Sequence, residues 1–182
     1  GSTLGATGAA LLGLMLPAAT SVSKLSLANN NLFGINQYGH GTYTTEHITK
    51  LCEGLKGSAV TSLNLANNRL SGADRWGPLG PHTYRTEGIT KLCEALKGSA
   101  VTSLDLAYNQ ICDLHTTKLC EGLRGSTVTS LNLWANKIGD KGASVIAAVL
   151  KETIISELNI GINRIGVKGV SALAAILKET QI

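Results

Sequence analysis

The sequence predicts an α/β solenoid of right-handed horseshoe shape, with parallel strands on the concave face and helices on the convex face. Three observations lead to this class. A strand-like leucine pattern recurs five times, a helix-like apolar pattern lies between its copies, and only 4% of the 182 residues are aromatic. With 43% hydrophobic and 15% charged residues the chain can bury a core. That core must be built from repeated aliphatic side chains.

The strand pattern follows the frame L-x-x-L-x-L-x-x-N-x-L, in which apolar positions alternate and an asparagine follows the strand. An interval of 27 residues separates Val101 from Val128 and Val128 from Ile155. The asparagine amides fall where the chain leaves the sheet and where buried backbone groups need partners, so we predict a structural column. Its members are Asn30, Asn68, Asn109, Asn136 and Asn163.

Between the strands, apolar residues recur at the spacing i, i+3, i+4 and i+7, as in Ile48, Leu51, Cys52 and Leu55. This spacing is the inward stripe of a short amphipathic helix. The last helical turns carry a basic column that complements the helix dipole and covers the convex surface, so we interpret it as structural. Its members are Lys56, Lys97, Arg124, Lys151 and Lys178.

The repeats extend over residues 1–182 as a single domain of about five strand-turn-helix units. Part of a repeat lies at each end, because residues 4–8 match residues 138–142 and Ile182 stands where another repeat would open. Solenoids need polar terminal caps, and neither end supplies one. The sequence therefore indicates a fragment of a longer array and leaves end-to-end contacts through the uncapped repeats open.

The segment from Leu131 to Ala143, with the helix that follows it to Leu150, resembles leucine-rich repeats of the ribonuclease-inhibitor type. Such repeats also form the sensor arrays of NOD-like receptors and the body of the Ran GTPase-activating protein. The resemblance covers nearly the whole chain except two inserts. It implies a eukaryotic, intracellular, cytoplasmic module that binds a protein partner, but a fold does not fix a function. The catalytic edge residues of the GTPase activator match no position here.

Several other classes of protein are disfavoured. The net charge of +4 is mild and its basic residues follow the helices, so we expect no nucleic-acid partner. The apolar run from Ala9 to Ala19 is interrupted by Gly13 and Pro17 and is too short to span a bilayer. No metal-binding or catalytic motif is found, so we expect no metal, no cofactor and no enzyme. The helical cysteines are expected to be small buried side chains in a reducing compartment: Cys52, Cys93 and Cys120.

Exposed strand positions that differ between repeats are the first candidates for binding. The first two repeats carry only Ser, Asn and Ala there, whereas the later three bring aromatic and apolar residues beside polar ones, as in interface hot spots. The alternative is that Trp134 only caps the sheet or packs on its neighbour. The concave candidates are Asp105, Tyr108, Asn132, Trp134, Asn159 and Ile162.

Two inserts, near residues 33–44 and 71–85, are the second candidates. Leu32 and Val60 are 28 residues apart and Leu70 and Val101 are 31 apart, against 17 for Ile111 and Val128. Inserts at the same point of adjacent repeats should leave one edge of the horseshoe side by side, where partners often bind. The alternative is that they only pack on each other and cover the sheet edge. The edge candidates are Phe33, Tyr38, His40, Tyr43, Trp76, His82 and Tyr84.

These observations leave three hypotheses about function. The first is a scaffold that binds a protein partner on the concave face or on the aromatic edge loops. The second is a regulator that binds a small GTPase or accelerates its hydrolysis. The third is an architectural component of a cytoskeletal or ciliary assembly.

Overall fold

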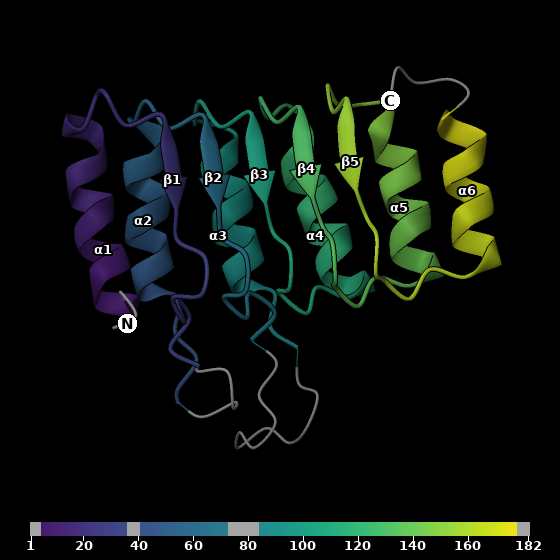
Figure 1. Cartoon of the computed structure of the whole chain (residues 1–182), viewed down its shortest axis with the longest axis horizontal. Coiled ribbons are helices and arrows are strands. Elements are labelled where there is room, and N and C mark those ends of the chain that lie inside the picture. Colours follow the sequence, from purple (N-terminus) through teal and green to yellow (C-terminus); the bar gives the residue numbers. More distant parts are fainter. Residues whose placement is uncertain (1–4, 36–40, 73–83, 178–182) are drawn as a thin grey trace.

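The computed structural model describes residues 5–35, 41–72 and 84–177 of the chain. Figure 1 shows a row of strands and a row of helices that follow one another in sequence order along the long axis. All neighbouring strands pair in parallel and form one open sheet in the order β1-β2-β3-β4-β5. The strands are β1 (Lys24–Ser26), β2 (Ser62–Asn64), β3 (Ser103–Asp105), β4 (Ser130–Asn132) and β5 (Glu157–Asn159).

One helix follows each strand, and a further helix precedes the first. Each helix packs against the helix before and after it, as expected of a solenoid whose repeats contact only their neighbours. The predicted fold class is confirmed. The helices are α1 (Gly5–Met15), α2 (Glu46–Lys56), α3 (Glu87–Leu96), α4 (Asp113–Leu123), α5 (Asp140–Leu150) and α6 (Val167–Leu177), with a short 3-10 turn η1 (Leu16–Ala18) after α1.

The core lies between the sheet and the helices. The central leucines of neighbouring strands are in register, so that Leu63, Leu104 and Leu131 stack in one column and are each at most 2% exposed. The predicted helical stripe faces this column, with Ile48 and Leu51 fully buried. Because each strand is only three residues long, the sheet derives its stability from side chains stacked along the array rather than from long ladders of hydrogen bonds.

The asparagine column joins each repeat to the one before it. The Oδ1 atom of Asn109 accepts the backbone N–H groups of Asn68 (3.0 Å) and Leu70 (3.2 Å). Its Nδ2 atom donates to the carbonyls of Leu65 (2.9 Å) and Ala107 (3.1 Å). Asn68 and Asn136 each have equivalent partners in the repeat that precedes their own. The predicted structural column is thus confirmed as a ladder of amides that satisfies buried backbone groups.

The cysteine column is confirmed as buried and consists of free thiols. Cys52, Cys93 and Cys120 are 4%, 6% and 3% exposed. Burial raises the pKa of each of these thiols to about 12. Helices approach closely here, because a Cβ atom on Gly122 would lie 2.2 Å from the Cβ atom of Cys93. The column therefore consists of small side chains that allow neighbouring helices to pack.

Candidate functional site

We define the concave patch as the six strand-face candidates Asp105, Tyr108, Asn132, Trp134, Asn159 and Ile162. The register of the sheet places the polar members side by side, because Asp105 pairs with Asn132 and Asn132 with Asn159. The Asn132 amide donates to the Asp105 carboxylate (3.1 Å). The structure thus brings these candidates together on the later three strands.

The aromatic part of the patch is ordered by contacts within the chain. The rings of Tyr108 and Trp134 meet edge to face, with centroids 4.8 Å apart and an interplanar angle of 82°. Trp134 also lies over Gly161, where a Cβ atom would come within 3.0 Å of the indole Cδ1 atom. Because a glycine leaves this space open, the indole is held between two repeats. Its half-buried ring keeps part of its surface in contact with solvent.

The turn after each strand places the third residue beyond the strand in the left-handed backbone region, including Ala135 (φ 53°) after β4. The first three repeats hold a second such residue two positions later, at Asn31, Arg69 and Gln110. In the first two repeats the third residue beyond the strand is an asparagine, with φ of 62° at Asn29 and 53° at Asn67. In later repeats the same position holds Tyr108 (φ 57°) and Ile162 (φ 52°), which are 50% and 69% exposed. Asparagine tolerates this conformation, whereas a β-branched residue adopts it only as a rare outlier. Two large side chains are therefore presented to solvent from an unfavourable backbone conformation.

The edge candidates behave differently, and the prediction for Phe33 was wrong. Phe33 is fully buried. It stacks on Tyr43 with centroids 5.7 Å apart, and a Cβ atom on Gly88 would lie 2.4 Å from its ring. The physical reason is that the first insert starts by turning back into the core, where the glycine of α3 leaves room for the ring. Phe33 is a core residue and offers no surface to a partner.

The bases of the two inserts contact each other. The Tyr43 hydroxyl accepts the Gly88 N–H (3.1 Å), and the Arg85 guanidinium lies 5.0 Å from the Tyr43 ring centroid. Burial raises the pKa of Tyr43 to about 12. Figure 1 shows the described parts of both inserts on the same long side of the array, at the bottom of the view. This contact supports the side-by-side placement predicted from the sequence.

Tyr84 is half-buried at the end of the second insert. Its ring meets the His115 ring edge to face at 5.6 Å, and the Lys137 ammonium lies 5.8 Å from its centroid. The remaining edge candidates Tyr38, His40, Trp76 and His82 lie outside the described residues.

Sequence reasoning did not pair Cys112 with His115, whose side chains meet at the start of α4. The signal that could have found this pair is a departure from the repeat. Gly139 and Gly142 hold the equivalent positions at the start of α5.

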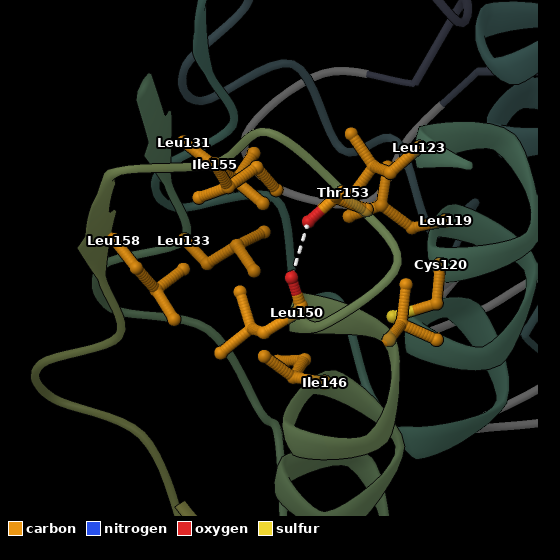
Figure 2. Close-up of a pocket in the computed structure, with 11 residues that line it drawn as sticks. Leu119, Cys120, Leu123, Leu131, Leu133, Ile146, Leu150, Thr153, Ile155 and Leu158 are labelled. Carbon is orange, nitrogen blue, oxygen red and sulfur yellow. Dashed lines mark hydrogen bonds between the residues drawn. The ribbon is translucent and has the colours of Figure 1, made fainter. Parts of the chain in front are cut away.

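Two hollows formed by described residues are each smaller than an ordinary small-molecule site. Figure 2 shows the interior space between the last repeats, lined by aliphatic residues such as Leu131, Leu133 and Leu150. Its volume is about 10 Å³, at the lower limit of what one water molecule needs. A shallow groove of about 180 Å³ runs between α3 and α4, lined by Thr90, Lys118 and their neighbours. Across the part of the chain that the structure describes, no cluster of metal-ligating side chains forms.

No helix among the described residues is long and apolar enough to cross a membrane.

Comparison with known proteins agrees with this architecture. Residues 126–147 and 153–174 match the profile of the family described as leucine-rich repeat. A solved structure described as leiomodin-1 actin-binding site 2 superposes with a TM-score of 0.62 over 92% of this chain and 88% of that chain, at 18% sequence identity. Comparison with curated proteins gives no match. The fold is that of a leucine-rich-repeat solenoid.

Proposed function

We propose that this chain is an intracellular, cytoplasmic protein-recognition module with repeats of the ribonuclease-inhibitor type, which binds one protein partner on its concave patch. In this proposal the module is non-catalytic and uses no cofactor. The partner's identity follows from neither the repeats nor the fold.

The observation that carries the proposal is the conformation of Ile162. A non-glycine residue in the left-handed region costs about 1–2 kcal/mol. With 69% of its surface exposed, Ile162 recovers little of that cost by burial within the chain. Asn67 shows that the same turn accepts a residue with a better preference for this conformation. In this proposal, a partner that covers Ile162 recovers this cost.

Trp134 provides the anchor of the patch. Large aromatic side chains dominate interface energies when they are buried among polar neighbours. The Tyr108 ring and the clearance over Gly161 fix the indole before binding, so little side-chain entropy is lost when a partner covers it. The Asp105 carboxylate and the Asn132 amide lie beside it and supply hydrogen-bonding groups.

The test compares three variants in affinity capture with cross-linking from a eukaryotic lysate, followed by titration against the purified captured protein. Trp134→Ala and Ile162→Asn change the concave patch, and Asn67→Ala is the matched control at the same turn position in an earlier repeat. We expect Trp134→Ala to weaken binding about 30-fold, as for a hot spot of about 2 kcal/mol.

We expect Ile162→Asn to weaken binding while leaving the melting temperature unchanged or slightly raised. Asn67→Ala should leave the affinity within about twofold. Equal affinity for the wild type and both concave variants, all folded by circular dichroism, would exclude the concave patch as the binding surface.

The other two hypotheses predict different partners in the same experiment. A GTPase regulator should capture a small GTPase in a nucleotide-dependent way and accelerate its hydrolysis. An architectural component should instead self-associate or join filaments through the ends of the array, where α1 exposes Leu11, Leu14 and Met15 at 58–72%. Either result with an unaffected Trp134→Ala variant would replace the present proposal.

A further inference from the structure

A cysteine and a histidine form a hydrogen-bonded pair at the start of α4. The Cys112 Sγ atom lies 3.1 Å from the His115 Nδ1 atom, and the Cys112 backbone N–H donates to the same nitrogen (3.2 Å). The other ring nitrogen, Nε2, lies 3.1 Å from the Arg85 carbonyl oxygen at the end of the second insert. The arrangement of the Cys112 thiol, the His115 imidazole and the Arg85 carbonyl is that of a nucleophile, a base and a group that orients the base.

The hydrogen-bond partners fix the tautomer of the imidazole. A carbonyl oxygen only accepts, so the Nε2 atom of His115 must carry the proton that it donates to Arg85. The Nδ1 atom then bears the lone pair that accepts the Cys112 backbone N–H, and the Cys112 sulfur lies 3.1 Å from the same nitrogen. Burial lowers the pKa of His115 and favours the neutral ring, although the hydrogen bonds to the Arg85 and Ser71 backbone act in the opposite direction.

The repeat frame does not require these side chains. At the equivalent positions of the next repeat, the Gly139 and Gly142 N–H groups donate to the Asp113 carboxylate at 2.7 and 3.0 Å. The repeat after that uses two glycines and Asp140 in the same way. Bonding to the insert through Arg85 explains an imidazole at position 115. The Cys112 sulfur caps α4 by accepting the His115 N–H, a role that a serine or asparagine oxygen fills as well, so capping does not by itself require a thiol.

Cys112 also differs from the other cysteines. It is partly exposed, whereas Cys52, Cys93 and Cys120 are buried and burial raises the pKa of their thiols to about 12. His115 itself is fully buried, whereas Cys112 is partly exposed as a residue. Accessibility and a neighbouring base are the two conditions for a reactive thiol.

The charged and titratable groups around the pair come from three elements. Lys137, after β4, pairs with Cys112 across an isolated parallel bridge, and its ammonium group donates to the Gln110 side-chain oxygen (2.9 Å). Arg85 and Tyr84 face His115 from the second insert. The Asp113 carboxylate follows Cys112, but its Oδ1 atom is already bonded by two backbone N–H groups. The N-terminus of α4 adds the His115 N–H, which donates to the sulfur.

We propose that Cys112 is a reactive thiol, activated by His115, that exchanges with small disulfides. The thiol proton passes to the His115 Nδ1 atom, and the Cys112 sulfur attacks one sulfur of the disulfide R–S–S–R. The S–S bond breaks, a Cys112–S–S–R mixed disulfide forms, and the leaving RS⁻ takes the proton from the imidazolium as RSH. No electrons are required beyond those of the disulfide itself. This site is independent of the concave patch.

The test measures the reaction of the folded chain with 4,4′-dithiodipyridine, with mass-spectrometric mapping of the modified cysteine. We expect Cys112 to react first and alone, while the three buried cysteines serve as internal controls. Cys112→Ser should abolish this phase. His115→Gln, which keeps a polar side chain of similar length, should slow the reaction at pH 6.5 at least about tenfold. Circular dichroism checks that each variant is folded.

The pH dependence of the reaction rate of wild-type Cys112 is a second test, and it needs no variant. A thiol paired with a base keeps reacting at pH 6.5 with less than a tenfold loss from pH 8.5, whereas an ordinary thiol of pKa near 8.5 loses about fiftyfold. An ordinary profile would overturn the proposal. So would an unchanged rate in a folded His115→Gln variant, or modification of a buried cysteine before Cys112.

Discussion

Replacing Asn109 with alanine tests how the asparagine ladder stabilises the array. Asn109 is fully buried and lies at the centre of the ladder. Its Oδ1 atom accepts the N–H groups of Asn68 and Leu70. Asn109→Ala removes this acceptor. Two buried N–H groups would then be left without partners.

The expected cost follows from those two donors. A buried donor that loses its partner costs about 1–3 kcal/mol, so Asn109→Ala should lower the free energy of unfolding by about 4 kcal/mol. The carbonyls that Asn109 bonded add little. Leu65 O retains the Asn68 Nδ2 donor (3.1 Å), and Ala107 O retains the Asn67 N–H (2.9 Å).

Asn163 is the matched control at the end of the ladder. Its Oδ1 atom accepts the Ile138 N–H (3.0 Å), but the side chain is half-buried and water can replace part of the interaction. We expect Asn163→Ala to cost about 1 kcal/mol.

Urea unfolding followed by far-ultraviolet circular dichroism measures both variants, with the m-value reporting whether the transition keeps its cooperativity. Equal costs at the two positions, or a cost below about 1 kcal/mol for Asn109→Ala, would refute the account of the ladder. A low cost for Asn109→Ala would mean that the aliphatic core alone holds neighbouring repeats in register.

Two further predictions concern the cysteine column. Gly122→Ala should destabilise the fold by about 2 kcal/mol, because its Cβ atom would collide with Cys93. Gly98→Ala should cost less than half as much, because its Cβ atom meets Lys56 at 3.6 Å. Thermal melting compares the two variants, and equal shifts in melting temperature would contradict the collision. Burial raises the pKa of the Cys52, Cys93 and Cys120 thiols from 9.0 to about 12, so their contribution to stability is complete below pH 9 and is lost as the pH rises towards 12. The free energy of unfolding should fall across that range, and a flat profile in urea titrations would show that these thiols are not buried in solution.

The fold was predictable because its signals are local and repeated. Three signals recur along the chain: the alternation of leucines, the helical stripe through Ile48 and Leu51, and the asparagine after each strand. An ambiguous secondary-structure assignment in one repeat is therefore resolved by comparison with the others. The role of Asn109 also follows from its place in the frame, since a turn away from a buried sheet leaves backbone groups that need partners.

The candidate site was predictable only in part. The sequence placed Tyr108 and Trp134 in neighbouring columns, because the repeat length fixes which strand positions lie side by side. It misassigned Phe33, since aromatic content in an insert does not show which side chains return to the core. That decision depended on Gly88, which belongs to another repeat and leaves the space that the ring fills.

The sequence by itself determined the solenoid, its parallel register and the surface positions that vary between repeats, because each depends on periodicity alone. Tertiary structure decided which of these positions act together. Examples are the space over Gly161 that the Trp134 ring occupies, the left-handed backbone at Ile162, and the contacts from Cys112 through His115 to Arg85. Such contacts depend on distances of a few ångströms between non-repeated side chains, and no period in the sequence encodes them.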